Sequence, residues 1–581
     1  MHAIIFPNVY VALRLPSDTL KVLQIVPNTT ISIGKYGTFQ ANHILGRPYH
    51  LTFEILDETD DSVRSGLRIV PAAELYADIT EGELKTSAGS DDGKVIDGKD
   101  GVEYEVVTEN GEVVMRTNCQ TVDDPASQVM SQEEIEALKR EGTGSGKDLI
   151  AKILESHSAL DQKTAFALAK YTLRKAKKYM RRFTVLPVDV PLLTHWIMTE
   201  KEPMKIMELR EEMLALVGSW SNVHFGGSNG VYSREDGTGQ VGGGRWLIVD
   251  ETGGLVVAAM AEKMGILYPP ESDQPSELIQ TVHEEFEGGD TDIANGAAED
   301  HSSGKNQSAQ SNRPKPKRQS LSMSAPTNTL TVIHANSQPN LSLLKYFLFD
   351  STNPSSSHPL NSHLKTVSWL QLLSPSDDAG YAEPEVVPDD ILKSYKSGKR
   401  GNYYRKRRRW ERIKSVVDES RAGGYDGLIV ASFMDPFTIL HHAVPLLRGG
   451  AQVVVYSPNV EPLAELADCY STSRRTAFLN NPLEVPNEDF PLNPTLLLAP
   501  TIQTARCRNW QVLPGRTHPL MTGRGGAEGY IFTATRVLPA EGKVEARGRY
   551  KRRKAGDIGK GDEASSKQDP VNSITGQTEA I

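Results

Sequence analysis

The stretch RWLIVDETGGLVVAAMAEKMG, residues 245–265, decides the fold of the larger part of this chain. Its first six residues predict a buried strand, and its last eleven predict an amphipathic helix. Between them lies a tight turn that holds Gly253 and Gly254. This order of strand, turn and helix is typical of a nucleotide-binding unit, in which a glycine-rich turn holds a phosphate or a methionine-type cofactor.

The sequence after this stretch repeats the alternation of strand and helix. Apolar runs predict strands at residues 245–250, 329–334, 366–373, 426–432, 451–457 and 529–537. Residues 433–450 predict a helix that ends at Gly449 and Gly450. The alternation predicts an α/β fold with a mainly parallel, doubly wound sheet over residues 241–540. A polar insert at about 271–325 and a basic tail at 541–581 are predicted to be disordered.

The first 240 residues follow other patterns. Residues 1–122 predict a small β-barrel domain, from short alternating strands and a hairpin at 102–117 around Asn110-Gly111. The polar residues 86–100 are predicted to form an inserted loop. Residues 123–240 predict a helical connector, with a cap at Ser131 and a long helix from about Lys163 to Phe183.

Composition limits the class of protein. The chain has 581 residues, 38% hydrophobic and 24% charged, which indicates a soluble globular protein with polar inserts. We expect no membrane span and no secretory signal. The three cysteines lack metal-ligand spacing and indicate a reduced intracellular compartment. The net charge is −10, but acids gather at residues 271–300 and cations gather elsewhere, so local charge decides which partners can bind.

Three features of the strand–helix domain argue against a working cofactor site. The turn Asp250–Gly254 lacks the G-x-G-x-G spacing. The second strand ends in His334, without the acid that would hold ribose hydroxyls. After the fourth strand, Asp435-Pro436 is only a displaced trace of the Asp-x-Pro-type turn that a methyltransferase would place there. We therefore expect no productive cofactor binding in this domain.

A second glycine-rich stretch, EGTGSGK at residues 141–147, imitates a phosphate loop. Its first required glycine is replaced by Glu141, and Asp148 stands where Ser or Thr should follow Lys147. A charged helical pattern precedes it in place of an apolar strand. The stretch therefore predicts a flexible turn between two helices.

The strongest binding signal lies in FALAKYTLRKAKKYMRRF, residues 166–183. Steps of three and four residues predict an apolar helix face made of Phe166, Ala169, Leu173, Ala176, Met180 and Phe183. An adjacent face carries Lys170, Arg174, Lys177, Lys178 and Arg181, flanked by Lys175 and Arg182. Like charges one turn apart destabilise a helix, and residues 163–186 contain no acid. The pattern favours a surface for a polyanion over the alternative of a merely solvated face.

Two further stretches combine basic residues with a second feature. Residues 393–414 interleave cations with Tyr395, Tyr403, Tyr404 and Trp410, which suits RNA through phosphate pairing and base stacking; a nuclear-localisation run is the alternative. The run RPKPKR, residues 313–318, is the better localisation candidate because it lies in the polar insert. The stretch RNWQVLPGRTHPLM, residues 508–521, predicts a loop, in which His518 is more typical of a structural than of a catalytic histidine.

Several stretches together resemble one family, the non-catalytic subunits of the eukaryotic tRNA adenine-N1 methyltransferase that acts at position 58. They are GKYGTFQANHILGRPYHLTFEI (34–55), GKDLIAKILESHSALDQKTAFALAKYTLRKAKKY (146–179), DETGGLVVAAMAEKMGILYP (250–269), DGLIVASF (426–433) and NWQVLPGRTHP (509–519). The resemblance implies an N-terminal β-barrel, a Rossmann-like methyltransferase fold with a degenerate cofactor site, and a heterotetramer with two copies each of this chain and a catalytic partner. It further implies that the partner holds S-adenosylmethionine, that the complex is nuclear, and that it supports maturation of initiator tRNA.

The same resemblance implies that this chain binds tRNA and positions the T-loop adenine, which is flipped toward the partner's pocket. Together with the basic helix, it gives these expected tRNA-binding residues: Lys170, Arg174, Lys175, Lys177, Lys178, Tyr179, Arg181, Arg182, Lys201, Lys205, Arg405, Lys406, Arg407, Arg408, Arg409, Arg506 and Arg508. No catalytic, cofactor-binding or metal-binding residue is expected. Two alternatives stay open: an active S-adenosylmethionine-dependent RNA methyltransferase, and a translation-initiation scaffold that does not contact tRNA directly.

Overall fold

A computed structural model of the chain describes residues 4–56, 66–75, 93–94, 107–108, 129–140, 146–157, 165–224, 243–269, 327–513, 516–520 and 526–538. These residues all belong to one compact unit, Met1–Leu538. The predictions for the insert at 271–325, the tail at 541–581 and the Asn110-Gly111 turn lie outside the described residues. None of the helices within the described ranges is both long enough and apolar enough to cross a membrane.

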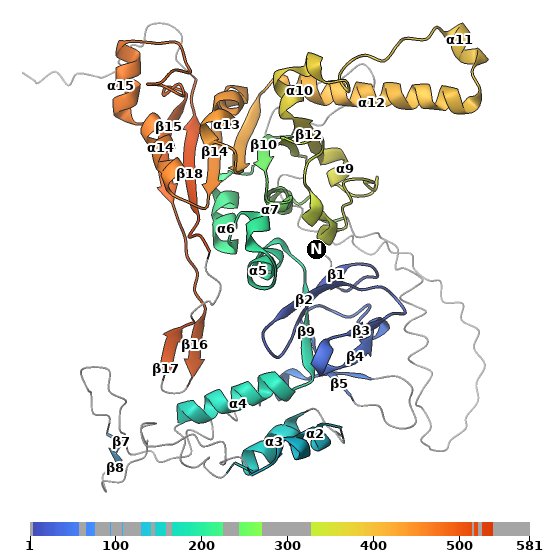
Figure 1. Cartoon of the computed structure of the whole chain (residues 1–581), viewed down its shortest axis with the longest axis vertical. Coiled ribbons are helices and arrows are strands. Elements are labelled where there is room, and N and C mark those ends of the chain that lie inside the picture. The colour runs from blue at the N-terminus through green and yellow to red at the C-terminus, as the bar shows by residue number, and fades with distance from the viewer. Residues whose placement is uncertain are drawn as a thin grey trace, which may run out of the picture. The chain divides into compact units, whose positions relative to one another are not determined.

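A seven-stranded mixed sheet organises the C-terminal part of this unit (Figure 1). Its order is β12-β11-β10-β13-β14-β18-β15. The bounds are β10 Arg245–Asp250, β11 Thr329–His334, β12 Leu364–Ser368, β13 Tyr425–Ala431, β14 Leu447–Ser457, β15 Leu497–Gln503 and β18 Tyr530–Arg536. The first five strands in this order are parallel, and β18 runs antiparallel between β14 and β15. The predicted α/β, Rossmann-like fold class is confirmed.

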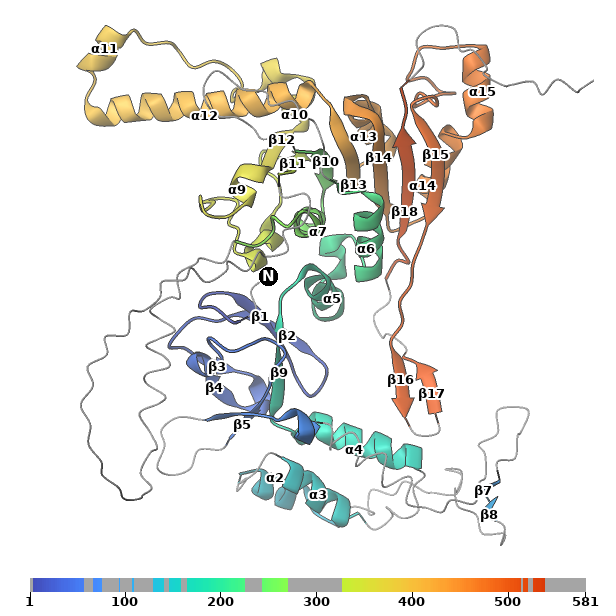
Figure 2. The same ribbon diagram turned by 180° about the vertical axis from the view of Figure 1, so that it is seen from behind.

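Apolar side chains alternate between the two faces of this sheet and fill a core on each. Trp246 and Ile248 of β10 belong to one core, and Leu247 and Val249 belong to the other. The first face is covered by α5 (Val190–Glu200), α6 (Glu211–Trp220), α7 (Leu255–Met264) and η6 (Ser342–Phe347). The second is covered by the end of α12 (Ser397–Arg421), by α13 (Pro436–Ala443) and by α14 (Glu461–Cys469), as Figure 2 shows from behind.

Three predictions in this part are corrected by the structure. The strand predicted at 366–373 ends at Ser368, which begins a capping box with Gln371 and starts helix α10 (Trp369–Leu373). The helix predicted to end at Gly449-Gly450 ends at Ala443, and both glycines belong to β14. The loop predicted before the last strand contains the hairpin β16 (Trp510–Leu513) and β17 (Arg516–Pro519).

The N-terminal part is an antiparallel β structure. A five-stranded sheet has the order β2-β1-β9-β5-β6, with β1 Tyr10–Arg14, β2 Leu20–Gln24, β5 Thr52–Ile55, β6 Leu67–Ile69 and β9 Arg182–Pro187. The strands β3 (Thr30–Ser32) and β4 (Thr38–Gln40) form a separate hairpin. Phe183 lies between Phe39 and Phe53, with ring centroids 4.6 and 5.6 Å away, in the core beneath this sheet. The helix predicted to reach Phe183 is therefore wrong at its end.

The described residues between β6 and β9 include the helices α2 (Gln132–Arg140), α3 (Lys147–Glu155) and α4 (Ala165–Tyr179). The predicted cap of α2 is confirmed, because the Ser131 hydroxyl accepts a hydrogen bond from the Glu134 backbone N–H and the Glu134 carboxylate accepts one from the Ser131 backbone N–H. The strands β7 (Gly93–Lys94) and β8 (Val107–Thr108) pair within the region where a loop and a hairpin were predicted.

The remaining elements are short. They are η1 Gly34–Tyr36, η2 Ala41–His43, η5 Pro203–Ile206, α9 Leu360–His363, η7 Pro375–Asp377, α11 Asp389–Ser394, η8 Val444–Leu446 and α15 Thr472–Asn480. Of these, η5 lies next to a site described below, as does η6.

A filled cofactor turn and a candidate nucleic-acid interface

The acid at the end of β10 holds its own turn together. Asp250 is buried, and one carboxylate oxygen accepts hydrogen bonds of 2.6 Å from both the backbone N–H and the hydroxyl of Thr252. The other oxygen accepts a bond of 3.1 Å from the Val257 N–H. Burial raises the pKa of Asp250, and these hydrogen bonds oppose that rise. The carboxylate is therefore occupied by the chain's own donors.

The two glycines that follow are covered by a neighbouring segment. Gly253 and Gly254 both have positive φ angles, of 74° and 91°. The Gly253 carbonyl accepts a hydrogen bond of 3.0 Å from the Leu343 N–H. A Cβ added to Gly253 would lie 3.4 Å from Leu343 Cγ, and one added to Gly254 would lie 3.2 Å from Leu341 Cα. The chain at the start of η6 thus fills the space over the turn, where a cofactor would have to approach the backbone.

The neighbouring strand ends are engaged in the fold as well. The Glu251 carboxylate accepts a hydrogen bond of 2.6 Å from the Phe433 N–H, which ties the glycine turn to the loop after β13. His334, at the end of β11, bonds through Nδ1 to the Asn336 carbonyl at 2.6 Å, and burial lowers the pKa of His334. Asp435 caps α13. These residues therefore support turns and a helix at the strand ends.

Helix α4 presents a row of exposed cations. Lys170, Arg174 and Lys178 are exposed at intervals of four residues. Arg174 and Lys178 form no ion pair among the described residues. Lys175 is half-buried against the Tyr171 ring, 4.9 Å from its centroid, and burial is the main cause of its lowered pKa. The helix therefore carries a row of exposed cations in which Arg174 and Lys178 are not neutralised by ion pairs within the described residues.

Other residues of α4 attach the helix to the fold. Ala176 and Tyr179, with Met180 just after the helix, pack with apolar residues of α2 and α3. Leu173 is 39% exposed, so the predicted apolar face is wrong at that position. Lys177 forms an ion pair with Asp18. Tyr179, one of the expected tRNA contacts, is buried, with 9% of its surface exposed.

Arg182 does not belong to the exposed row. Its side chain is 6% exposed and forms ion pairs with Glu54, at 3.0 Å, and with Glu74. The partly exposed Arg68 pairs with the same two carboxylates. This network lies on the face of the sheet opposite Phe183, because neighbouring residues of a strand point to opposite faces, and it leaves almost no surface of Arg182 for RNA. Arg181 is half-buried just before β9. We therefore exclude Arg182 from the candidate interface.

The loop after α5 carries the second predicted pair of cations. Lys201 and Lys205 are both exposed, and the Lys201 ammonium lies 5.1 Å from the centroid of the Trp196 ring. Lys205 forms an exposed ion pair of 3.1 Å with Glu202. The loop is fixed from beneath, because the Met207 carbonyl accepts a hydrogen bond of 3.0 Å from the buried Tyr456 hydroxyl.

The third predicted cluster lies on α12, a helix of 25 residues whose N-terminal part projects away from the sheet (Figure 1). Arg405, Lys406, Arg408 and Arg409 are exposed there. Arg407 is half-buried and faces Glu383 and Glu411, at 3.5 and 3.6 Å. Trp410 donates a hydrogen bond of 2.9 Å to the Tyr381 carbonyl, so this aromatic residue anchors the helix and is not an open stacking surface.

The last two predicted residues precede the β16–β17 hairpin. Arg508 is exposed, and Arg506 is half-buried with its guanidinium 3.6 Å from the Glu528 carboxylate. Strand β16 contacts α4, so the hairpin lies beside this helix (Figures 1 and 2). His518 lies within β17, where it faces Gln511 across the hairpin.

Sequence reasoning missed the residues that seat α4 on the N-terminal sheet. The Tyr36 hydroxyl of η1 donates a hydrogen bond of 2.8 Å to the Lys177 carbonyl, and Asp18 pairs with the Lys177 ammonium. Both partners are more than 140 residues away along the chain. No local pattern could have identified them.

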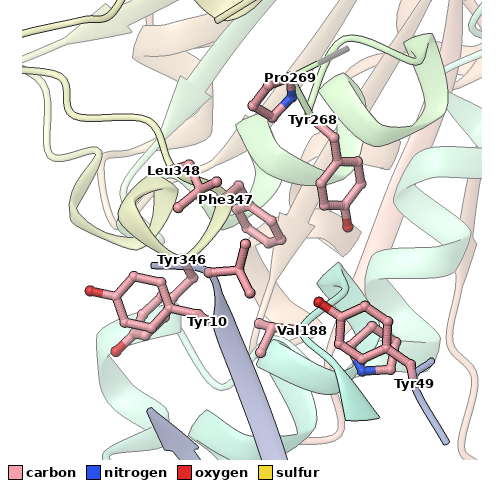
Figure 3. Close-up of a pocket in the computed structure, with 10 residues that line it drawn as sticks. Tyr10, Tyr49, Val188, Tyr268, Pro269, Tyr346, Phe347 and Leu348 are labelled. Carbon is pink, nitrogen blue, oxygen red and sulfur yellow. The ribbon is translucent and has the colours of Figure 1, made fainter. Parts of the chain in front are cut away.

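A separate pocket of about 400 Å³, including its open mouth, lies between the N-terminal sheet and the segment around η6. Figure 3 shows Tyr10 with Tyr346 on one side and Tyr49 with Tyr268 on the other. Burial raises the pKa of Tyr49 to about 12, and the Tyr268 hydroxyl donates a hydrogen bond of 3.1 Å to Glu262. The residues that line the pocket are all uncharged, so this site offers rings and neutral hydroxyls but no ionised group for acid–base chemistry.

The sheet with its reversed β18, together with a glycine turn filled by the chain's own leucines, defines the class: a methyltransferase-type Rossmann-like protein with a degenerate cofactor turn. Comparison with known proteins gives the family. The sequence profile of the Gcd10p family matches residues 4–396. The chain belongs to the Gcd10p family, whose matching relatives are the non-catalytic subunits of tRNA (adenine(58)-N(1))-methyltransferase.

The relatives match along nearly their whole length. The subunit named trm6 from Aspergillus fumigatus is 52% identical, over 95% of this chain and 96% of its own. The subunit TRM6 from Debaryomyces hansenii is 29% identical, over 98% of this chain and 91% of its own. Among solved structures, tRNA (m1A58) methyltransferase TrmI from Aquifex aeolicus has a TM-score of 0.35 at 8% identity, covering 92% of this chain and 100% of that one. The prediction of a non-catalytic subunit is confirmed.

Proposed function

We propose that this chain is the tRNA-binding half of its methyltransferase complex, and that it positions the T-loop adenine of tRNA for the catalytic partner. The observation that carries the proposal is the row of Lys170, Arg174 and Lys178 on α4. A phosphate backbone is the ligand that best offsets the repulsion within such a row, because each neutralised phosphate also releases counterions. Lys201, Lys205 and the exposed cations of α12 extend the proposed contact.

The proposed division of labour places S-adenosylmethionine in the partner. Leu341 and Leu343 occupy the space over Gly253 and Gly254, and Asp250 already accepts three hydrogen bonds. A cofactor in this chain would have to displace the buried Leu341 and the half-buried Leu343 and leave buried donors without partners, which is costly. The alternative of an independently active methyltransferase finds no support in this geometry.

Calorimetry tests this division directly. We expect S-adenosylmethionine to give no binding heat with this chain alone, and to titrate the complex with one site per catalytic subunit. Methyl transfer to tRNA should require both subunits, so omission of either chain should abolish it. Saturable binding of the cofactor to this chain alone would contradict the proposal.

We also propose the assembly that the family resemblance implies, with two copies of each subunit, and a role for the complex in maturation of tRNA, including initiator tRNA. A translation-initiation scaffold without direct tRNA contact is the remaining alternative. The two differ in salt dependence: direct contact predicts that log Kd rises with log salt, with a slope of roughly 0.7–0.9 per phosphate contact. Binding of tRNA by the complex without such dependence would favour the scaffold.

A nuclear location is proposed from the run at residues 313–318. A fluorescent fusion of the full chain should accumulate in the nucleus, and replacing the four cations of RPKPKR with alanine should shift it to the cytoplasm. Replacement of Arg405, Lys406, Arg408 and Arg409 on α12 provides the comparison, because it decides whether the second basic run contributes. Unchanged nuclear accumulation in both variants would contradict a localisation role for either run.

A further inference from the structure

The end of the EGTGSGK stretch lies against the C-terminal end of the cationic helix. Gly146 caps α3 with a φ of +78°. A Cβ added to Gly146 would lie 2.5 Å from the Tyr179 carbonyl oxygen and 3.3 Å from Met180 Cα. Only glycine permits both this backbone conformation and this close approach, so the position brings the start of α3 onto the last turn of α4.

The next residue ties the same point to the N-terminal sheet. The Lys147 ammonium lies 3.1 Å from the Glu74 carboxylate, and both side chains are partly buried. Glu74 also binds Arg68 and Arg182, and the hydrogen bond from Arg68 is the main reason that the pKa of Glu74 falls to about 2. Arg182 begins β9, only three residues after Tyr179 ends α4. Lys147, which precedes α4 in the chain, and Arg182, which follows it, thus pair with the same Glu74 carboxylate.

Apolar contacts complete this junction. Ile150 and Ile153 of α3 pack with Tyr179, Ala176 and Met180. Such apolar contacts are non-directional, whereas the Gly146 contact and the Lys147 ion pair fix particular atoms of the junction.

We propose that Gly146 and Lys147 are positioning residues that set the direction of α4, so that its cations meet successive phosphates of the bound tRNA. This inference rests on the proposed function of α4 as a tRNA-binding helix. A row of cations gains from several phosphates at once only when it is held in the matching direction, because ordering it on binding would cost part of the affinity. The residues act through α4 and need not touch the RNA.

Gly146→Ala is the decisive variant because it removes no charge. In the complex with the catalytic partner, we expect tRNA affinity to fall about fivefold or more, through loss of preorganisation. The slope of log Kd against log salt should fall by the equivalent of about one or more phosphate contacts. Gly46→Ala is the matched control: Gly46 has a φ of +72° and no atom within 4 Å of an added Cβ, so it adds the backbone strain without a clash.

Lys147→Met tests the second link and also covers the case in which Gly146→Ala fails to assemble. Lys152→Met is its control, since Lys152 is an exposed lysine on the same helix and has no ion pair among the described residues. We expect Lys147→Met to lower tRNA affinity and to speed amide exchange in the last turn of α4, Lys152→Met to change neither, and Lys147→Arg to restore both.

The outcomes separate this inference from the proposed function. If neutralising the α4 cations weakens tRNA binding while an assembled Gly146→Ala or Lys147→Met complex binds with the normal salt slope, the positioning role is wrong and the function stands. If the α4 cations themselves make no difference, the proposed function fails first. A loss of affinity in Lys147→Met that Lys152→Met reproduces would likewise overturn the positioning role, because general charge would then explain it.

Discussion

Replacing Lys170, Arg174 and Lys178 together with alanine is expected to weaken tRNA binding by the complex about 10- to 100-fold at 0.15 M salt, because three phosphate contacts and their counterion release are lost. The slope of log Kd against log salt should flatten by about two to three. Assembly should be unchanged, because Ala176, Tyr179 and Met180, which pack on α2 and α3, are kept. Fluorescence anisotropy of labelled tRNA across a salt series measures both quantities.

The matched control keeps the charge and changes only the side chains. A complex with Lys170→Arg, Arg174→Lys and Lys178→Arg should retain the salt slope, since the row still offers three cations. The alanine variant should also lower methyl transfer at limiting tRNA and recover at saturating tRNA, as expected for a binding defect. An unaltered slope in an assembled alanine variant would show that α4 is only a solvated surface.

The central fold could be predicted from sequence because its signals are local. Residues 245–265 contain a strand, a turn and a helix whose apolar residues follow the right period within a few residues of one another, and β10 and α7 are found there. The degenerate turn could likewise be predicted, because the G-x-G-x-G spacing is missing from the sequence. The residues that fill the turn could not be predicted, because Leu341 and Leu343 reach Gly253 and Gly254 from a segment about 90 residues away.

Strands with mixed signals were harder to predict. Phe183 and Val185 fit the end of a helical pattern as well as a strand, and only packing against Phe39 and Phe53 decides for β9. The missed β15 contains Pro500 and an irregular register between Leu498 and Thr501. Proline is tolerated there because β15 lies at the edge of the sheet, but it weakens the strand signal in the sequence.

The candidate site was predictable as a set of cations but not as a surface. Lys170, Arg174 and Lys178 are exposed as their spacing suggests, whereas Arg182 belongs to a buried ion network. Its partners Glu54 and Glu74 lie more than 100 residues earlier in the chain. Charge type and helical period cannot reveal such pairing, so a basic run in a sequence contains both binding and structural cations.

Arg182 is expected to contribute to the stability of the fold. Arg182→Met should lower the free energy of unfolding of the N-terminal part by about 1–3 kcal/mol, because the nearly fully buried Glu54 carboxylate loses one of its two charged partners and keeps Arg68. Glu54→Leu should destabilise by a similar amount, since it strips Arg182 of its Glu54 partner. The double variant should lose clearly less than the sum, because an apolar pair can replace a buried ion pair. Chemical denaturation of the four proteins gives this cycle.

The exposed ion pair between Glu202 and Lys205 should contribute little to stability. Glu202→Gln, which breaks this pair, should change the free energy of unfolding by no more than about 0.5 kcal/mol.

The stability of the fold should depend on pH through Glu74. The pKa of Glu74 is lowered from 4.5 to about 2 in the fold, so the stabilisation from its ion pairs is complete above pH 4.5 and is lost as the pH falls toward 2. Glu74→Gln should therefore flatten the acid limb of the stability curve between these values.

The outcome for Arg182→Met also decides the role of Arg182 itself. If this variant is as stable as the wild type and shows only a smaller salt slope of tRNA binding, Arg182 must turn outward to the RNA. The buried network then cannot be what holds β9 in place.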